Sequence, residues 1–263
     1  MACMDTLIVE KKEAIGQITF NDPAKLNAMS YDMWAGLTDA LAQFEKDDEV
    51  RIVVVTGAGD KAFVSGANIS EFQKRRTGAD AVAEYERVAE GAQDALYNFL
   101  KPTVARIRGY CIGGGLNLAL CCDVRIACEG STFFLPAGKM GLGYRFSAIR
   151  NLVTAVGAPN ALDIFLSARR FDTAQALQAG LVQLTAPSET FDDVVQDYLD
   201  KVAANAPLTL RAGKQMIRQF QQLPAQTDLE HMRALMQACF DSEDYAEGKQ
   251  AFAQKRPPQF RGR

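Results

Sequence analysis

Three consecutive glycines, at positions 113–115, separate a short apolar run from an apolar segment over residues 116–122. Glycine lets the backbone approach a ligand closely and adopt conformations that other residues resist. If residues 116–122 are helical, the glycines lie at the helix N-terminus, where free N–H groups and the positive end of the dipole face outward. This place suits an anion, or an oxygen that becomes anionic during a reaction. The alternative is a tight strand-to-helix turn buried in the core.

Few side chains offer acid–base or metal chemistry. The single histidine, His231, lies in a charged stretch typical of a solvated helix, so catalytic triads and histidine-rich metal sites are not expected. Six cysteines, at positions 3, 111, 121, 122, 128 and 239, form no spaced metal pair, and we expect buried free thiols in a reducing compartment. We therefore expect no metal site, and chemistry by backbone dipoles, carboxylates, tyrosine or water.

The composition is that of a soluble globular protein, with 263 residues of which 48% are hydrophobic and 23% charged. This length suits one large domain, or one domain with a small appendage. The net charge of −3 argues against nucleic acid as a partner. No apolar run is long enough to span a bilayer, and no secretory signal is visible. We expect a cytoplasmic protein that binds neither nucleic acid nor a membrane.

Strands and helices alternate on both sides of the glycines. A β-branched run over 51–56 predicts a strand covered on both faces, and residues 103–107 predict the strand that leads into the glycines. Ser30 is placed to cap a helix over 31–47. The sequence thus predicts an α/β layered core, then a mainly helical region. Further expected elements are a hairpin over 6–20, a helix over 80–100, strands over 124–127 and 132–135, and helices over 146–156, 159–167, 173–179, 190–204, 207–221 and 225–253.

A second glycine-bearing turn, over residues 62–69, follows the strand predicted over 51–56. Residues 57–62 superficially match a dinucleotide-binding fingerprint, but that motif needs a helix to open there. The sequence that follows is short and apolar and ends in a glycine turn. We therefore predict a hairpin or loop.

Together, residues 62–69 and 109–123 resemble the corresponding turns of the crotonase family, the enoyl-CoA hydratase/isomerase superfamily, and the resemblance covers nearly the whole chain. Residues 25–28 resemble that family's first coenzyme A loop, and residues 135–143 resemble its active-site loop. The resemblance implies a spiral of ββα units with the acyl-CoA site over 1–200. It also implies a C-terminal helical trimerisation region over 201–263, with assembly as homotrimers or dimers of trimers.

The resemblance implies a substrate thioester whose carbonyl oxygen accepts hydrogen bonds from the N–H groups of Ala67 and Gly114. Charge builds on that oxygen when an enolate forms, and fixed donors stabilise it without reorganising. No tightly bound cofactor is expected, because coenzyme A is part of the substrate. Lys25, and Phe252 with Lys255 from a neighbouring subunit, are expected at the phosphates and adenine. The implied acyl-CoA contacts are Lys25, Leu26, Ala28, Ser65, Ala67, Asn68, Ile69, Ile112, Gly113, Gly114, Pro136, Ala137, Phe252 and Lys255.

Two positions depart from the family's hydratases, which use two glutamates to position and activate water. Asn117 and Ala137 stand at the matching positions, and neither side chain exchanges a proton with water near neutral pH. We therefore do not expect a proficient two-glutamate hydratase. Asn117 could still hold a water or a substrate oxygen, and the alternative for it is helix packing.

Tyr144 is the candidate substitute. Residues 140–152 resemble the matching segment of the family's methylmalonyl-CoA decarboxylases, which carry a tyrosine in the matching place. Such an enzyme has to orient the carboxylate that is lost. Tyr144 could do so with Arg145 nearby, or could instead line the acyl pocket. Those decarboxylases carry a histidine where this chain has Ala67. Asp123, at a helix end, is expected to be structural.

Three functions remain open. The first is hydration or isomerisation of an enoyl-CoA by an altered set of groups, which would make the protein a lyase or isomerase. The second is decarboxylation, or another enolate reaction, that uses Tyr144. The third is a catalytically silent acyl-CoA-binding oligomer, although a scaffold would not need the glycine site.

Overall fold

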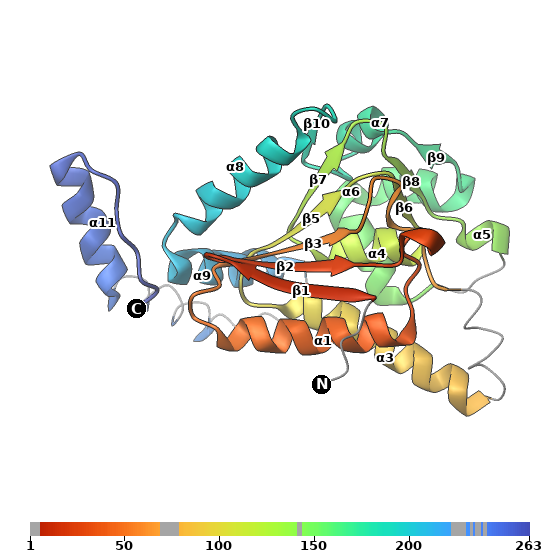
Figure 1. The fold of residues 1–263 in the computed structure, drawn as a ribbon, viewed down its shortest axis with the longest axis horizontal. Coiled ribbons are helices and arrows are strands. Elements are labelled where there is room, and N and C mark those ends of the chain that lie inside the picture. The colour runs from red at the N-terminus through yellow and green to blue at the C-terminus, as the bar shows by residue number, and fades with distance from the viewer. Residues whose placement is uncertain are drawn as a thin grey trace.

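The computed structural model describes residues 6–68, 79–140, 144–221 and 241–263, together with positions 230, 231, 234 and 238. The described strands form two sheets, with helices packed around them (Figure 1). The larger sheet has the order β1-β2-β3-β5-β7-β10, and the smaller has the order β4-β6-β8-β9. The α/β core predicted from the sequence is therefore present.

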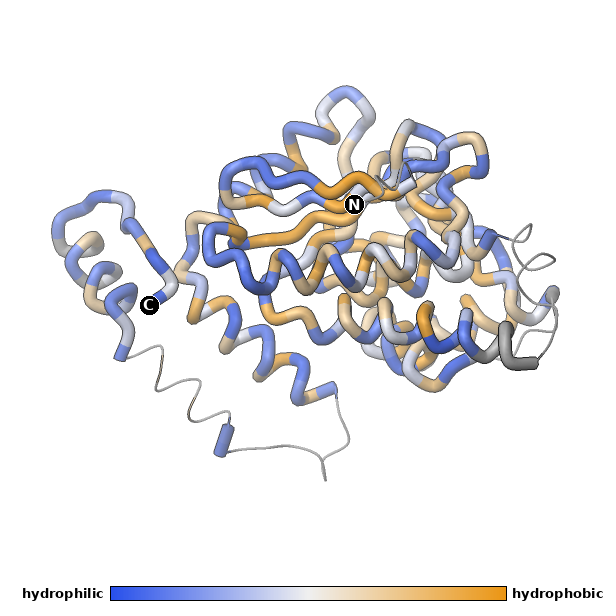
Figure 2. The backbone as a smooth tube through the Cα atoms, turned by 60° about the horizontal axis from the view of Figure 1, so that its bottom comes forward, coloured by the Kyte–Doolittle hydropathy of each residue, from blue (hydrophilic) through white to orange (hydrophobic). Residues whose placement is uncertain are grey.

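The larger sheet begins with the predicted hairpin, in which β1 (Leu7–Lys12) pairs antiparallel with β2 (Ile15–Phe20). The strands β3 (Ile52–Gly57), β5 (Thr103–Ile107), β7 (Val124–Cys128) and β10 (Leu184–Ala186) continue it in parallel. Alternate residues of a strand face opposite sides of a sheet. β3 is accordingly buried on both faces, as its β-branched run predicts, and Figure 2 shows hydrophobic residues along the central strands.

The smaller sheet is built from short strands that follow strands of the larger one. β4 (Ala62–Val64), β6 (Tyr110–Ile112) and β8 (Thr132–Phe134) come after β3, β5 and β7, and they run parallel to one another. β9 (Arg170–Phe171) adds an antiparallel edge. No helix opens over residues 57–62, as predicted, but β4 pairs in parallel with β6 instead of forming a hairpin. The result is a repeated strand–strand–helix unit.

The helices begin and end close to their predicted bounds. In α1 (Tyr31–Lys46), the Ser30 hydroxyl accepts a hydrogen bond from the Met33 N–H at 3.1 Å, which confirms the predicted cap. In α6 (Phe146–Ser167), Gly157 takes a φ of 73°, so the predicted break between 146–156 and 159–167 is a kink within one helix. The others are η1 (Pro23–Lys25), α3 (Ala79–Asn98), α4 (Gly114–Cys121), α5 (Ala137–Met140), α7 (Thr173–Gln178), α8 (Phe191–Ala203), α9 (Pro207–Gln219) and α11 (Glu243–Gln254).

The C-terminal segment folds back along α11, which lies apart from both sheets (Figure 1). The carboxylate of Asp244 accepts a hydrogen bond from the Gly262 N–H at 2.7 Å, and Glu247 pairs with Arg256 at 2.6 Å. The helix predicted over 225–253 is described in full only over α11, because residues 222–229 and most of 232–240 lie outside the described part. The division into 1–200 and 201–263 stays a prediction.

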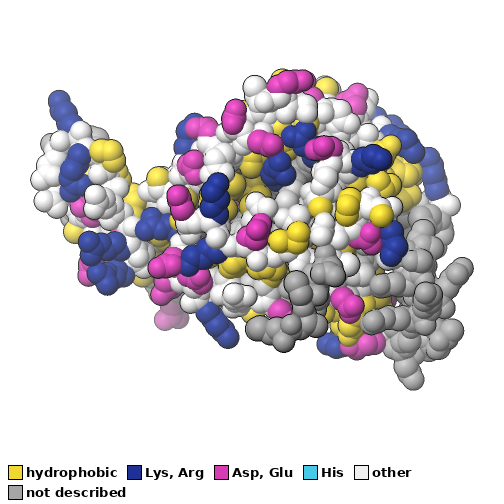
Figure 3. Space-filling model, viewed as in Figure 1, with side chains coloured by type: hydrophobic (Ala, Val, Ile, Leu, Met, Phe, Trp, Pro, Cys, Tyr) yellow, Lys and Arg dark blue, Asp and Glu magenta, His cyan; other side chains and the backbone are white. Residues whose placement is uncertain are grey.

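The described surface carries mixed charge. On the face in Figure 3, positive and negative side chains are interspersed instead of forming a patch of one sign.

No described helix is long and apolar enough to cross a membrane. No described group of three or more His, Cys, Asp or Glu residues could hold a metal ion. Four cysteines, Cys111, Cys121, Cys122 and Cys128, are buried free thiols, as predicted.

Candidate functional site

The glycine stretch forms the N-terminus of α4, as one of the two sequence interpretations requires. Gly113 precedes the helix with φ 55° and ψ −114°, a conformation that residues with a side chain rarely adopt. Its N–H donates to the Phe134 carbonyl at 2.9 Å, and its carbonyl accepts from the Asn117 N–H at 3.0 Å. The C=O and N–H of a trans peptide point in opposite directions. The N–H of Gly114 therefore points out of the helix end.

Gly115 brings the first turn of α4 directly against β4. A Cβ on Gly115 would lie 2.1 Å from the Val64 carbonyl oxygen and 2.8 Å from the Val64 Cβ. Real Cβ atoms do not approach a backbone oxygen so closely, so only glycine fits here. This contact places the helix end beside the turn that leaves β4, over residues 65–68.

The N–H of Ala67 is directed by the residue that pairs with it. Met29 and Ala67 form an isolated parallel bridge. The Met29 N–H donates to the Gly66 carbonyl at 2.8 Å, and the Met29 carbonyl accepts from the Asn68 N–H at 3.0 Å. The Ala67 N–H belongs to the same trans peptide as the Gly66 carbonyl, so it points away from Met29.

The two directed N–H groups lie side by side. A Cβ built on Gly114 would stand 3.9 Å from the Ala67 nitrogen. Between described residues, no hydrogen bond uses the N–H of Ala67, and the N–H of Gly114 precedes the first intrahelical bond of α4. Two free backbone donors at one position can together bind a carbonyl oxygen or an oxyanion. These are the two N–H groups that the family resemblance implies, and their role stays a prediction.

The loop over residues 25–28 lies against the Ala67 turn. The Ser65 N–H donates to the Leu26 carbonyl at 3.2 Å, and the Ser65 hydroxyl donates to the Lys25 carbonyl at 3.4 Å. Leu26 and Asn27 both adopt a φ of 54°, and the buried Asn27 amide donates to the carbonyls of Ala58 and Ala62. The structure therefore brings the predicted loop to the site. Asn27 is a supporting residue that the sequence analysis missed.

The other wall comes from the segments on either side of α4. A Cβ on Gly113 would lie 3.8 Å from Pro136 Cδ, and one on Gly66 would lie 3.6 Å from the Ile112 carbonyl. Ala137, where α5 begins, is 1% exposed. Ile112 and Pro136 thus lie beside the two glycine turns, and Ala137 follows Pro136 directly. The methyl group of Ala137 offers no proton chemistry.

Tyr144 has a buried hydroxyl for which the described residues provide no hydrogen-bond partner. Its ring packs edge-on against Phe165, with the ring centres 5.7 Å apart. Burial raises the pKa of Tyr144, and the side chain of Asn117 acts in the opposite direction, although the two groups do not reach hydrogen-bond geometry. Tyr144 is therefore a protonated donor, and it lies near Asn117 in the first turn of α4.

The guanidinium of Arg145 has a protein partner, so it is not free to bind a substrate carboxylate beside Tyr144 without leaving that partner. Its guanidinium pairs with the Glu86 carboxylate and donates to the Glu86 carbonyl at 2.9 Å. Both acceptors belong to α3, and the carboxylate satisfies the charge there. The sequence held no signal for this contact, because Arg145 and Glu86 are distant along the chain.

One predicted contact among the described residues, Lys255, is not brought to the site within one chain. Ile69 and the side chain of Phe252 lie outside the described residues. Lys255 is exposed at the end of α11, which Figure 1 shows at the opposite end of the molecule from α5. A role for Phe252 and Lys255 in a neighbouring subunit stays a prediction.

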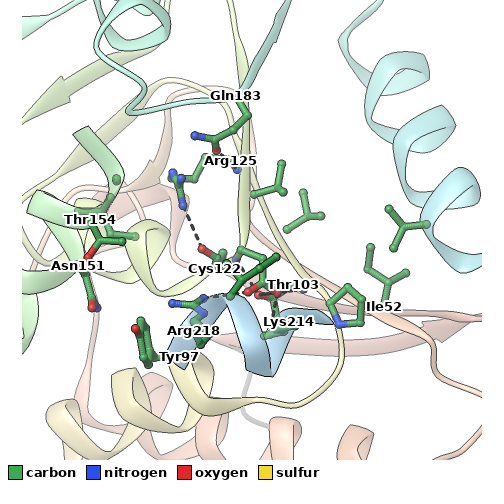
Figure 4. Close-up of a pocket in the computed structure, with 18 of the residues that line it drawn as sticks. Ile52, Tyr97, Thr103, Cys122, Arg125, Asn151, Thr154, Gln183, Lys214 and Arg218 are labelled. Atoms are coloured by element: carbon green, nitrogen blue, oxygen red, sulfur yellow. Dashed lines mark hydrogen bonds and ion pairs between the residues drawn. The ribbon is translucent and has the colours of Figure 1, made fainter. Parts of the chain in front are cut away.

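A cavity of about 520 Å³ lies at the other end of α4, and it is distinct from the glycine site. Figure 4 shows Lys214 and Arg218, both from α9, meeting beside Thr103. Both cations pair with Asp123, at 2.7 Å and 2.9 Å, and the same carboxylate accepts from the Thr103 N–H and hydroxyl. The guanidinium of Arg218 also lies 3.9 Å from the centre of the Tyr97 ring.

The charged residues in this cavity neutralise one another and hold α9 in place. Burial alone would raise the pKa of Asp123, but Lys214 and Arg218 outweigh it and lower that pKa. At Lys214, burial lowers the pKa of the ammonium group, and this effect outweighs the opposite effect of Asp123. The cluster is thus a buried ion network in which Asp123 holds α9 against the start of β5. The structural role predicted for Asp123 is consistent with these contacts.

Comparison with known proteins identifies close relatives of the whole chain. Residues 10–263 match the family described as enoyl-CoA hydratase/isomerase. The 2,3-dehydroadipyl-CoA hydratase of Escherichia coli K12 is 33% identical over 99% of this chain and 100% of its own length. The short-chain-enoyl-CoA hydratase of Clostridium acetobutylicum is 30% identical, with 96% of each chain covered. A crystal structure of an enoyl-CoA hydratase/carnithine racemase from Magnetospirillum magneticum superposes with a TM-score of 0.91, at 33% identity over 99% of this chain and 97% of that one.

Proposed function

Because the chain belongs to the enoyl-CoA hydratase/isomerase family, with its fold, we propose that it holds the enolate of an acyl-CoA thioester between the N–H groups of Ala67 and Gly114. One observation carries the proposal. Two free backbone donors stand side by side, and a Cβ built on Gly114 would lie 3.9 Å from the Ala67 nitrogen.

The physics of the two donors suits an enolate. Negative charge builds on the thioester oxygen, and donors fixed in advance need no reorganisation as it does so. The carbonyl of Gly66 already accepts the Met29 N–H, which polarises the peptide that carries the Ala67 N–H. The Gly114 N–H adds the positive end of α4.

The acid–base groups of the site decide which reaction is supported. Asn117 and Ala137 cannot exchange protons as carboxylates do, and a general acid–base step contributes about 10²–10⁴-fold. We therefore propose that hydration or isomerisation of an enoyl-CoA, if catalysed, proceeds through water or other groups. Coenzyme A enters as part of the thioester substrate, and no tightly bound cofactor is proposed.

Decarboxylation is the second candidate, and the buried Tyr144 hydroxyl favours it. When a malonyl-type thioester loses CO2, the carbon–carbon bond breaks and its electron pair passes to the thioester carbonyl oxygen. No base is needed, and water then supplies the proton for the α-carbon. The Tyr144 hydroxyl lacks a hydrogen-bond partner among the described residues, so it is available to orient a carboxylate.

A panel of thioesters in D2O distinguishes the candidates. Crotonyl-CoA, a 3-enoyl-CoA and methylmalonyl-CoA are each incubated with the protein and followed by NMR. Decarboxylation predicts deuterated propionyl-CoA from methylmalonyl-CoA, and hydration predicts 3-hydroxybutyryl-CoA. Rapid hydration of crotonyl-CoA would contradict the argument from Asn117 and Ala137. Tight binding with neither turnover nor deuterium at the α-carbon would show a catalytically silent acyl-CoA-binding protein.

We also propose assembly as a homotrimer or a dimer of trimers, in the cytoplasm. The support is the family membership and the family resemblance of the C-terminal region. Sedimentation velocity of the purified protein tests the assembly, and a monomer at micromolar concentration would contradict it.

A further inference from the structure

We infer that Tyr85 is a positioning residue of the thioester site, acting on the Ala67 N–H through Met29; its catalytic meaning rests on the proposed function. Tyr85 lies on α3 and is 6% exposed. Its hydroxyl donates to the Met29 carbonyl at 3.2 Å and accepts from the Trp34 indole N–H at 3.2 Å. The hydroxyl reaches the backbone that aims the oxyanion donor, not the donor itself.

Met29 is the residue through which this contact acts. Its carbonyl accepts from both the Tyr85 hydroxyl and the Asn68 N–H, the latter at 3.0 Å, and its N–H donates to the Gly66 carbonyl at 2.8 Å. The peptides on either side of Ala67 are therefore both tied to Met29. Any movement of Met29 rotates the Gly66–Ala67 peptide and changes the direction of the Ala67 N–H.

Beyond the bonds of Ser65 to the Lys25 and Leu26 carbonyls, the pairing of Met29 with Ala67 has few other supports. It is an isolated bridge outside the named strands, so no neighbouring ladder pairs hold its register. Tyr85 adds a bond from a separate helix, and Trp34, in the first turn of α1, orients the Tyr85 hydroxyl. The chain from Trp34 through Tyr85 to Met29 is buried, where successive hydrogen bonds polarise one another.

The expected effect of losing the hydroxyl falls on the transition state. Removing one whole oxyanion donor lowers kcat about 10²–10³-fold. Tyr85→Phe only misaligns the Ala67 N–H, so we expect kcat to fall about tenfold. KM should change little, because the pocket walls stay in place. Tyr97→Phe is the matched control, since Tyr97 lies on the same helix, is equally buried and loses one hydroxyl hydrogen bond, at 2.8 Å to Gln221, away from the site.

The first measurement reads the donor directly. Crotonyl-CoA labelled with ¹³C at the thioester carbonyl is bound to the wild type and to both variants, and isotope-edited infrared spectra give the carbonyl stretching frequency. The wild type and Tyr97→Phe should lower this frequency equally on binding, and Tyr85→Phe should lose part of the shift. Equal shifts in all three proteins would overturn the inference.

The second measurement needs no ligand. Amide hydrogen exchange of Asn68 should be about fivefold faster in Tyr85→Phe than in the wild type, because the variant lacks one buried hydrogen bond. The exchange should be unchanged in Tyr97→Phe. Unchanged exchange in Tyr85→Phe would overturn the inference. If the wild type itself leaves the carbonyl frequency unshifted, the proposed function fails, while the exchange data still decide whether Tyr85 holds the bridge.

Discussion

The nitrogen of Ala67 lies 3.9 Å from the point where a Cβ on Gly114 would stand. The two residues come from separate glycine-bearing turns, one after β4 and one at the start of α4. Met29 aims one N–H group and the first turn of α4 aims the other. The proposed electrophilic half of the site is thus built from backbone alone, and substitutions that test it must act on backbone groups.

Gly114→Pro should remove one oxyanion donor without breaking α4. Proline is favoured at the first position of a helix, which is the position of Gly114. We expect kcat to fall about 10²–10³-fold, the usual loss for one donor, with an unchanged circular dichroism spectrum. The rate is measured with whichever thioester the panel shows to react.

Gly114→Ala is the comparison for that variant, because it keeps the N–H. Its Cβ would lie 3.9 Å from Ala67 N, an ordinary van der Waals distance, so the fold should be retained. The alanine variant should lose much less activity than the proline variant. Equal losses would mean that bulk at the helix end, and not the missing donor, is responsible.

Gly115→Ala should destabilise the protein instead. The new Cβ would lie 2.1 Å from the Val64 carbonyl oxygen, so β4 and α4 must separate. We expect a loss of about 1–3 kcal/mol in the free energy of unfolding, the usual cost of overpacking, measured by urea denaturation.

Gly91→Ala is the matched control for Gly115→Ala. Gly91 lies within α3, and a Cβ there would meet no atom within 4 Å. Alanine in a helix interior should raise the free energy of unfolding by about 0.5–1 kcal/mol relative to glycine. If both variants shifted stability in the same direction, the contact with Val64 would not be the cause.

Local patterns in the sequence predicted the elements that carry the site, because these elements depend on neighbouring residues. The glycines mark the turn before α4, Ser30 marks the start of α1, and the β-branched run marks β3. The supports of the Ala67 turn could not be predicted in this way. Tyr85 reaches Met29 across tertiary structure, and no periodicity or spacing reports such a contact.

The partner of Arg145 could not be predicted for the same reason. Its position directly after Tyr144 suggested a shared role, but neighbouring residues at the start of a helix point in different directions. The guanidinium instead meets Glu86 on α3. Chain proximity constrains the backbone and leaves the partner of a long side chain undetermined.

Asp123→Asn should cost far more stability than Asp192→Asn. Asp123 neutralises the buried Lys214 and Arg218, so its loss leaves two buried cations without a carboxylate, at an expected cost of about 3 kcal/mol. The exposed Asp192 pairs with Arg106 at the surface, and its loss should cost less than about 1 kcal/mol. Urea denaturation at pH 7 measures both, and similar losses would contradict the buried network.

The same network predicts a pH dependence. Lys214 and Arg218 lower the pKa of Asp123 in the folded protein, against the effect of burial. Its stabilisation is therefore fully present above the unfolded carboxyl pKa of about 3.9 and is lost as pH falls through the lower folded value. Asp123→Asn should flatten the fall in stability below about pH 4. An unchanged acid slope would show that other carboxyl groups govern it.

Tyr144→Phe should affect stability and activity in opposite directions. The Tyr144 hydroxyl is buried without a partner among the described residues, so its removal should raise the free energy of unfolding of the ligand-free protein by about 1 kcal/mol. Tyr97→Phe should lower it, because that hydroxyl bonds to Gln221.

If Tyr144 orients a substrate carboxylate, turnover of a malonyl-type thioester should fall at least about tenfold, as expected for a hydrogen bond to a charged group. A more stable variant with full turnover would leave Tyr144 as a wall of the acyl pocket. A less stable variant would mean that the hydroxyl has a partner in the free protein, and the argument for a waiting donor would fail.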